Sequence, residues 1–395
     1  MSAPTTLLVT VTGEDRPGLT AALLRAAARP GVEVVDVEQV VLRGRLTLGV
    51  LLGVPSEAAL EPLQDAVTAT AADLGLDCAT SPGRGDTAER RGGHLHVTML
   101  GHPLLPEAVA AVSGVLAEAG ANVDRLRRLA SQPVTALELD VSGVDDAPAL
   151  RAALARTAAE RAVDVAVSPA GLVRHGRRLV VMDVDSTLVQ DEVIELLAAH
   201  AGREAEVAAV TERAMRGELD FAASLHERVA ALAGLPVSVF DEVRRALRLT
   251  PGARTLVATL HELGFTVALV SGGFMEVVSP LARSLGIRRV RANRLEVADG
   301  RLTGRVLGGV VDRAGKAEAL RAFAREEGLP LERTVAIGDG ANDLDMLAAA
   351  GLGVAFNAKP LVREQADAAL TGPYLDAVLF LLGLDAEEIA DATRA

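Results

Sequence analysis

Two carboxylates, Asp183 and Asp185, stand two residues apart directly after the apolar run 179–182. An apolar run of this length predicts a buried strand, and alternate side chains of a strand point to the same side. Because neighbouring anions repel each other unless a cation neutralises them, the pair predicts a site for a hard, oxygen-seeking ion such as Mg²⁺.

A second group that could take part in chemistry is the tripeptide Ser271-Gly272-Gly273. It follows the apolar run 266–270 and precedes a predicted helix. A hydroxyl and free backbone N–H groups at the start of a helix favour an anion. The tripeptide therefore predicts a phosphate site.

A third group is Lys316, at the predicted start of the helix 316–327. A cation is unfavourable at the N-terminus of a helix, and this residue is one of only two lysines among the 40 basic residues. The preceding residues resemble a P-loop, but that motif needs glycine at Val310 and serine or threonine at Ala317. We expect a chemical role for Lys316 outside a P-loop.

The fourth group is GDGANDLDML at 338–347, directly after the apolar run 334–337. Asp339 occupies the place where a pyrophosphate would approach in a dinucleotide-binding turn, so the acids of this segment predict a metal site instead. Each of the four groups alone has an ordinary explanation as a helix N-cap or a surface charge. Together they favour one site.

The elements that position these groups alternate from residue 179 onward. Strands are followed by helices, which predicts an α/β, Rossmann-like parallel sheet with crossover helices. Ligands of such a sheet bind at the carboxyl ends of its strands, where all four groups stand. Between about 189 and 250 only helical periodicity is present, which predicts a helical cap inserted over the sheet.

The N-terminal part contains two copies of one unit. LLVTVTG at 7–13 aligns with LHVTMLG at 95–101, and each copy alternates as βαββαβ, the α+β ferredoxin-like arrangement. The sequence therefore predicts a four-part division. Its parts are a first domain at 1–82, a linker at 83–93, a second domain at 94–168 and the α/β domain at 169–395.

Composition and charge exclude several classes of protein. Hydrophobic residues make up 50% of the chain and the net charge is −13, which favours a globular protein. Because basic residues are not clustered with aromatic ones, we expect no nucleic-acid partner. The sequence shows neither a signal peptide nor an apolar stretch long enough to cross a membrane, so we expect a cytoplasmic protein without a membrane partner.

The order D-x-D-S-T, S-G-G, Lys and G-D-G-x-N-D resembles the haloacid dehalogenase (HAD) superfamily of phosphohydrolases. Residues 179–385 look most like its phosphoserine phosphatase subfamily, which carries a helical cap between the first two motifs. The resemblance implies Mg²⁺-dependent hydrolysis of O-phospho-L-serine to L-serine and phosphate, the last step of serine biosynthesis.

The resemblance also implies roles for individual residues. Asp183 would be the nucleophile that forms an aspartyl-phosphate, and Asp185 would act as general acid and then general base. Mg²⁺ would be held by Asp183, the backbone carbonyl of Asp185 and Asp339, with Asp343 behind them. The residues implied to bind the phosphate or the substrate are Lys316, Ser271, Gly272, Asn342, Glu192 for the ammonium group, Arg228 for the carboxylate, and Met215 and Phe221 at the closing side of the pocket.

The two N-terminal units are similar to ACT domains, small amino-acid-binding modules. The first has the turn Glu14-Asp15-Arg16-Pro17-Gly18, whereas the second lacks its Arg-Pro-Gly core. The resemblance implies an amino-acid effector, such as L-serine, near Asp15 and Gly18, and a homodimer formed through these units.

Two alternative functions remain open at this stage. One is a HAD phosphatase for another small phosphate monoester. The other is an amino-acid sensor with a vestigial phosphatase domain, although such a protein would be expected to have lost at least one of the four motif acids, and none is lost here.

Overall fold

The computed structural model describes residues 4–85, 92–170, 176–215 and 218–392. The chain divides into two compact units, residues 1–90 and 91–395.

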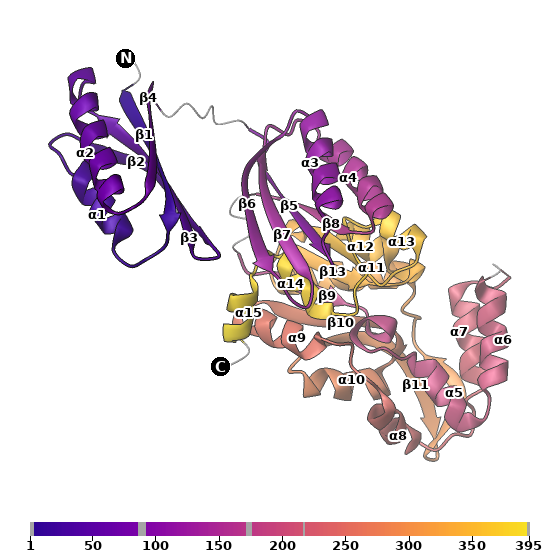
Figure 1. Cartoon of the computed structure of the whole chain (residues 1–395). Coiled ribbons are helices and arrows are strands. Elements are labelled where there is room, and N and C mark those ends of the chain that lie inside the picture. The colour runs from indigo at the N-terminus through magenta and orange to yellow at the C-terminus, as the bar shows by residue number, and fades with distance from the viewer. Residues whose placement is uncertain (1–3, 86–91, 171–175, 216–217, 393–395) are drawn as a thin grey trace. The chain divides into compact units, whose positions relative to one another are not determined.

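The first unit is a four-stranded antiparallel sheet in the order β2-β3-β1-β4, with both of its helices on one face (Figure 1). Leucine and valine side chains from the sheet and from both helices form its core. The described elements are β1 (Thr5–Glu14), α1 (Leu19–Ala27), β2 (Glu33–Leu42), β3 (Arg45–Val54), α2 (Leu60–Asp73) and β4 (Asp77–Arg84).

The second unit begins with the same βαββαβ arrangement, which confirms the repeat seen in the sequence. The strand order β8-β5-β7-β6 matches β4-β1-β3-β2 of the first copy. We call this part, residues 94–169, the second repeat. Its elements are β5 (Leu95–Gly101), α3 (Pro106–Glu118), β6 (Asn122–Ala130), β7 (Thr135–Ser142), α4 (Ala147–Arg161) and β8 (Asp164–Pro169).

The rest of the second unit, residues 179–392, is the core domain. Its sheet runs β12-β11-β10-β9-β13-β14-β15, and every neighbouring pair is parallel except β11 and β12. The predicted α/β sheet is confirmed. The strands are β9 (Leu179–Met182), β10 (Thr266–Phe274), β11 (Arg289–Ala298), β12 (Arg301–Leu307), β13 (Thr334–Gly338), β14 (Leu352–Phe356) and β15 (Ala368–Leu370).

Strand β9 at the centre of this sheet is buried on both faces. Leu179 and Val181 pack into the hydrophobic cluster on one face, and Val180 and Met182 pack into the cluster on the other. Helices α9 and α10 cover one face, and α11 and α12 cover the other. The bounds are α9 (Ala253–Glu262), α10 (Met275–Ser284), α11 (Arg313–Glu326), α12 (Leu344–Ala349), α13 (Pro360–Gln365), α14 (Val378–Leu381) and α15 (Ala386–Ala392).

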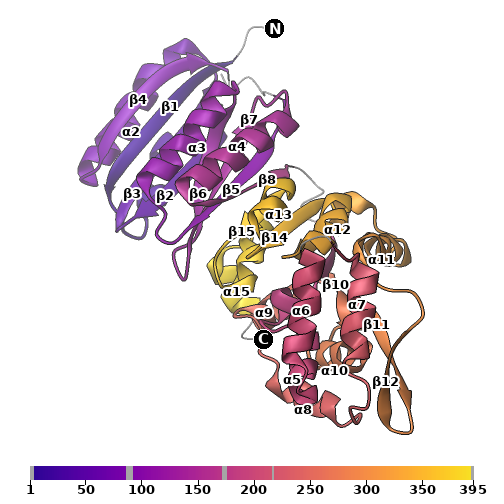
Figure 2. The same cartoon turned by 90° about the vertical axis from the view of Figure 1, so that its right-hand side faces the viewer.

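The predicted helical cap is present between β9 and α9. In Figure 2, α6 and α7 stand side by side at the front of the core domain. The segments that enter and leave the cap lie together, because Gln190 N donates to Arg248 O and Thr250 N donates to Leu188 O. The cap helices are α5 (Val193–Ala201), α6 (Glu204–Met215), α7 (Phe221–Ala230) and α8 (Val239–Ala246).

The second repeat shares a continuous sheet with the core domain, which the sequence did not suggest. Strand β8 pairs antiparallel with β15 at Ala166 and Ala368. The eleven strands described in this unit therefore form one sheet. The repeat is fixed to the edge of the core domain at this point.

Three predicted boundaries differ from the structure. Strand β4 extends to Arg84, inside the predicted linker 83–93, because it pairs with β1 as far as Thr5. Residues 271–273 lie within β10, whereas the sequence predicted them between a strand and the N-terminus of a helix. Helix α11 begins at Arg313, since Asp312 caps it by accepting from Gly315 N, so Lys316 lies inside its first turn.

Candidate active site

Asp183 stands at the carboxyl end of the central strand β9. Its backbone N donates to Ile337 O on β13 (2.9 Å), and its Oδ1 accepts from Val184 N (2.8 Å). The chain then turns sharply, with Ser186 in the left-handed region at φ 56. This turn brings Asp185 back toward the same edge of the sheet.

Lys316 lies between two carboxylates beneath this edge. Its Nζ is 2.8 Å from Asp183 Oδ2 and 2.7 Å from Asp343 Oδ1, and its side chain is 0% exposed. Burial by itself lowers the pKa of Lys316, but the two carboxylates raise it above the ordinary value. The ammonium group therefore stays charged and fixes both acids.

The carboxyl group of Asp183 has a raised pKa. The causes are burial and then the nearby Asp343 carboxylate, and Lys316 offsets them only in part. One ammonium group thus does not neutralise this cluster of acids.

Asp185 is held by two donors from different elements. Oδ1 accepts from Val193 N at the start of α5 (2.7 Å), and Oδ2 accepts from Ser271 Oγ on β10 (3.0 Å). Burial, and then the charge of Glu192, raise the pKa of Asp185 to about 6. A carboxyl group with this pKa can both donate and accept a proton near neutral pH.

Asp339 completes the acidic group. One carboxylate oxygen each of Asp183, Asp339 and Asp343 lies within 4.8 Å of the others. Burial, and then Asp343, raise the pKa of Asp339 to about 6, although Thr187 Oγ1 donates to its Oδ1 (3.0 Å). Three carboxylates against one ammonium group fit a hard divalent cation, which prefers oxygen ligands.

A cavity of about 480 Å³ opens above these acids, between the sheet edge and the cap. Glu192, Phe221 and Arg228 line it from the cap side. Ser186 Oγ donates to Glu192 Oε1 (2.8 Å), which orients that carboxylate. Burial lowers the pKa of Arg228. The cavity thus presents a carboxylate and a guanidinium group beside the acids.

Gly272 and Asn342 line the same cavity from the sheet side. A Cβ atom on Gly272 would lie 3.1 Å from Phe221 Cζ, so the absence of a side chain here lets the cap ring approach the strand. Ser271 is fully buried beneath them, where its Oγ also accepts from Gly273 N (2.7 Å).

The structure therefore brings together almost all of the residues that the sequence singled out for the catalytic site. Met215 ends α6, but its side chain lies outside the described residues. Asp15 and Gly18 lie in the first unit, in the turn between β1 and α1, where Gly18 has φ 97.

Sequence reasoning missed two supporting residues. Asn293 on β11 is buried, and its Nδ2 donates to Gly272 O (2.8 Å) while its Oδ1 accepts from Val311 N (2.8 Å). Asparagine is uncommon inside strands, and this was the available signal. The other is Thr187, whose contact with Asp339 joins residues far apart in the chain.

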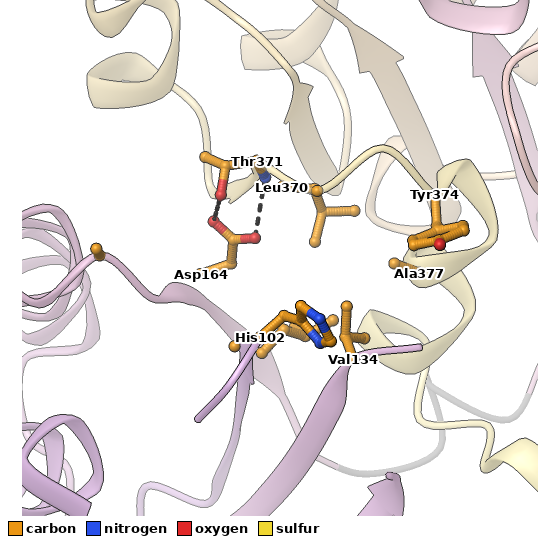
Figure 3. A pocket seen from close by; sticks show the side chains of 11 residues that line it. His102, Val134, Asp164, Leu370, Thr371, Tyr374 and Ala377 are labelled. Carbon is orange, nitrogen blue, oxygen red and sulfur yellow. Dashed lines mark hydrogen bonds between the residues drawn. The ribbon is translucent and has the colours of Figure 1, made fainter. Parts of the chain in front are cut away.

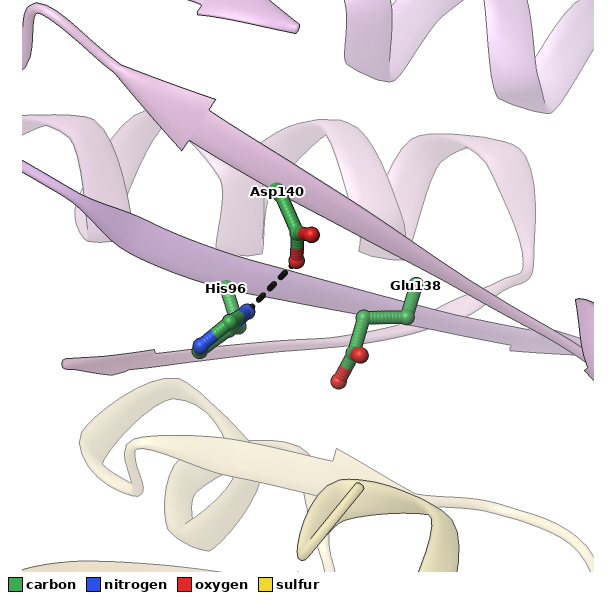
Figure 4. Close-up of side chains that lie close together, drawn as sticks. All are labelled: His96, Glu138 and Asp140. Atoms are coloured by element: carbon green, nitrogen blue, oxygen red, sulfur yellow. Dashed lines mark hydrogen bonds and ion pairs between the residues drawn. The ribbon is translucent and has the colours of Figure 1, made fainter. Parts of the chain in front are cut away.

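A second group that could hold a metal lies on the sheet of the second repeat (Figure 4). His96 Nδ1 is 2.7 Å from Asp140 Oδ1, and Glu138 Oε1 accepts from Arg127 Nε (2.9 Å) and from its terminal nitrogen (2.7 Å). Arg127 already neutralises Glu138. Two side-chain pairs across the sheet, His96 with Asp140 and Arg127 with Glu138, therefore account for these residues without a metal ion.

Three family models match the chain. The model described as haloacid dehalogenase-like hydrolase matches residues 180–348, and models described as ACT domain match residues 5–80 and 93–168. In the described residues, none of the helices is long and apolar enough to cross a membrane.

Similar proteins cover nearly the whole chain. Phosphoserine phosphatase of Streptomyces coelicolor is 58% identical over 98% of this chain and 94% of its own length. Phosphoserine phosphatase SerB2 of Mycobacterium tuberculosis is 54% identical over 99% of this chain and 96% of its own length.

Two solved structures are also similar. A substrate-bound phosphoserine phosphatase complex is 42% identical, covers 52% of this chain and 98% of its own, and has a TM-score of 0.50. An unliganded probable phosphoserine phosphatase from Vibrio cholerae is 34% identical, covers 76% of this chain and 88% of its own, and has a TM-score of 0.58.

Proposed function

The chain belongs to the phosphoserine phosphatase family of haloacid dehalogenase-like hydrolases, and on this premise we propose that it hydrolyses O-phospho-L-serine to L-serine and phosphate. The observation that carries the proposal is the cavity beside Asp183, which Glu192 and Arg228 line together. A carboxylate suits the ammonium group of an amino acid, and a guanidinium group suits its carboxylate. The reaction would form serine as the last step of its biosynthesis.

Asp183 is the nucleophile of this mechanism. One carboxylate oxygen forms a bond to phosphorus while the bond from phosphorus to the serine oxygen breaks, which gives an aspartyl-phosphate. Val184 N holds one oxygen of Asp183 and Lys316 holds the other, so the carboxylate enters the reaction in a fixed orientation. The Lys316 charge also stabilises negative charge on the phosphoryl group.

Asp185 moves the proton in both halves of the reaction. It first donates a proton to the departing serine oxygen. It then accepts a proton from the water whose oxygen attacks phosphorus, which releases phosphate and restores Asp183. The pKa of about 6 for its carboxyl group suits both directions of transfer.

The acids would hold a Mg²⁺ ion through Asp183, Asp339 and the backbone carbonyl of Asp185, with Asp343 behind them. When bound, Mg²⁺ neutralises the clustered carboxylates and polarises a phosphoryl oxygen. Asp343 orients Lys316 and accepts from Gly340 N (3.0 Å) with its other oxygen, so it positions the loop that carries Asp339.

The remaining pocket residues bind the ester. Ser271, the Gly272 N–H group and Asn342 contact the phosphoryl group, and Met215 and Phe221 close the pocket over the substrate. Phe221 already lies against Gly272, which supports its place at the closing side of the pocket.

Phosphate release tests the proposal. We expect rapid release from O-phospho-L-serine, slower release from O-phospho-L-threonine and p-nitrophenyl phosphate, and loss of activity in EDTA that Mg²⁺ restores. Equal rates on all three esters would contradict the pocket assignment and favour another phosphate monoester. No release from any of them would favour the amino-acid sensor.

We also propose that the first unit binds an amino-acid effector near Asp15 and Gly18 and that it pairs two chains. Valines and a leucine of β2 are exposed although β2 is an edge strand, which supports pairing with a second copy. These residues are Val34, Val35, Val37, Val40, Val41 and Leu42. Sedimentation of the full chain tests the dimer, and calorimetry with L-serine tests the effector.

A further inference from the structure

Ser224 on the cap helix α7 is a buried polar residue that the proposed mechanism does not use. Its side chain is 2% exposed, and its Oγ has no hydrogen-bond partner among the described residues. A serine inside a helix commonly turns its hydroxyl group to the carbonyl four residues earlier, but Ser224 Oγ makes no such bond. Because a buried hydroxyl group without a partner is unfavourable, a partner that arrives with a ligand is the simplest explanation.

This hydroxyl group belongs to the catalytic cavity. Ser224 lines the cavity together with Phe221, Leu225 and Arg228 of the same helix. The spacing of these four positions places them in one stripe along α7. Thr259 on α9 also carries a buried hydroxyl group without a partner among the described residues, but it is not part of the cavity wall. Ser224 therefore differs from Thr259 in facing the substrate site.

The order of residues along the stripe places Ser224 between the two ends of the substrate. Phe221 marks the phosphate end, because a Cβ atom on Gly272 would lie 3.1 Å from its Cζ. Ser224 and Arg228 follow about 4.5 Å and 10.5 Å further along the helix axis. Arg228 Nε donates to Ser224 O (3.3 Å), so the side chain of Arg228 runs back toward the turn that carries Ser224. A carboxylate bound by Arg228 thus lies near the Ser224 hydroxyl group.

The substrate carboxylate is the acceptor that fits this hydroxyl group. A carboxylate has about four lone-pair positions, and a bidentate guanidinium group fills two of them. A carboxylate taken out of water needs further donors. Glu192, which we assign to the ammonium group, already accepts from Ser186 Oγ (2.8 Å) and so has a donor of its own. The Ser224 hydroxyl group is therefore left to donate to the substrate.

A smaller cavity, of about 220 Å³, lies where the second repeat meets the core domain (Figure 3). The acid in its wall, Asp164, already accepts two hydrogen bonds, from Thr371 N to Oδ2 (2.9 Å) and from Thr371 Oγ1 to Oδ1 (3.0 Å). The protein itself thus supplies partners for this acid. In the catalytic cavity, by contrast, one buried donor has no acceptor, and this favours the catalytic cavity as the place where a ligand supplies the missing bond.

We propose that Ser224 determines specificity for the carboxylate of the substrate, because its Oγ–H group donates to a lone pair that Arg228 leaves free. The inference rests on the proposed phosphoserine phosphatase activity and adds a substrate-contacting residue to it. The hydroxyl group is unfavourable in the substrate-free protein and favourable in the complex. Ser224 therefore contributes to affinity and not to stability.

Kinetics of Ser224→Ala with three esters test the contact. O-Phosphoethanolamine keeps the ammonium group of phosphoserine and lacks the carboxylate, whereas 3-phosphooxypropanoate keeps the carboxylate and lacks the ammonium group. We expect kcat/KM to fall about tenfold for O-phospho-L-serine and for 3-phosphooxypropanoate, through KM rather than kcat. For O-phosphoethanolamine the loss should be less than about twofold. Equal losses on all three esters would overturn the assignment to the carboxylate.

The melting temperature of the substrate-free protein is the second readout. Ser224→Ala should melt at the same temperature as the wild type or higher, because it removes a buried hydroxyl group that has no partner. Thr259→Val is the matched control, since it removes the other such hydroxyl group and keeps the shape of the side chain. It should leave the KM for phosphoserine unchanged. A lower melting temperature for Ser224→Ala would show a structural partner and overturn the proposal.

A double variant tests whether Ser224 and Arg228 bind the same carboxylate. Ser224→Ala combined with Arg228→Ala should raise KM little more than Arg228→Ala alone, and fully additive losses would contradict a shared carboxylate. The wild type separates this inference from the proposed function. No preference of the wild type for phosphoserine over O-phosphoethanolamine would overturn both, whereas a preference that Ser224→Ala fully retains would overturn this inference alone.

Discussion

Lys316 Nζ lies 2.8 Å from Asp183 Oδ2 and both side chains are buried, although one residue lies in helix α11 and the other directly follows strand β9. The same nitrogen lies 2.7 Å from Asp343 Oδ1. One cation thus orients the proposed nucleophile and a neighbouring acid at once.

Replacing Asp183 by asparagine should leave a folded protein that does not turn over. The amide keeps the shape of the side chain but is a poor nucleophile, so we expect the rate of phosphate release from phosphoserine to fall at least about 10³-fold. Circular dichroism checks the fold. Activity near that of the wild type would remove Asp183 from the nucleophile role.

Replacing Lys316 by methionine should destabilise the fold as well as stop catalysis. Asp183 and Asp343 would then repel each other without a buried partner, and losing one member of such a pair costs about 3–5 kcal/mol. Urea unfolding in EDTA measures this free energy. The double variant Lys316→Met with Asp343→Asn should be less destabilised than Lys316→Met alone, and an equal loss would contradict the pairing.

The pKa of about 6 for the Asp185 carboxyl group predicts how stability depends on pH in metal-free protein. The folded state binds the proton more tightly than the unfolded state, whose carboxyl pKa is about 3.9. This contribution to stability is fully present below about pH 4 and is lost as the pH rises through about 6. Asp185→Asn should therefore flatten the decline in unfolding free energy between these values. Asp146→Asn, at an exposed helix cap, should leave the decline unchanged.

Arg228 should determine substrate choice rather than chemistry. Arg228→Ala should raise the KM for phosphoserine about 10-fold or more, because a charge-assisted contact to the substrate carboxylate is lost. Hydrolysis of p-nitrophenyl phosphate, which has no such carboxylate, should change little. Arg228→Lys should restore binding only in part, because an ammonium group cannot form the bidentate contact. Equal losses on both esters would contradict this assignment.

Asn293 should support the phosphate-binding strand without touching the substrate. Asn293→Ala leaves Gly272 O and Val311 N without their side-chain partner, and each such buried group costs about 1–3 kcal/mol. We expect a lower melting temperature and a lower kcat for phosphoserine. Asn293→Asp keeps the acceptor for Val311 N but places a second oxygen against Gly272 O in a buried position, so it should also lower the melting temperature. A fully active and stable Asn293→Ala protein would exclude this role.

Much of the site could be predicted because each acid or hydroxyl follows a short apolar run. Asp183 and Asp339 directly follow the strands β9 and β13, and Ser271 follows the apolar run inside β10; the carboxyl ends of parallel strands lie at one edge of a sheet. The roles assigned to them stay predictions that the proposed variants can test, and the four-part division of the chain also stays a prediction.

Residues that act through distant contacts could not be predicted in this way. Asn293 joins Gly272 to Val311, and no local pattern relates those positions. The first turn of α11 was misplaced for a related reason, since Asp312 begins the helix through a side-chain contact rather than through apolar spacing.

The sequence by itself determined the α/β class, the repeated N-terminal unit and the acids at the strand ends, because strand and helix periodicities and turn residues are local properties of the chain. Only the tertiary structure decided that β8 pairs with β15, that Lys316 lies between Asp183 and Asp343, and that a cavity with Asp164 in its wall exists. These features depend on which distant surfaces pack together, and the free energy of that packing is distributed over many contacts that no single segment contains.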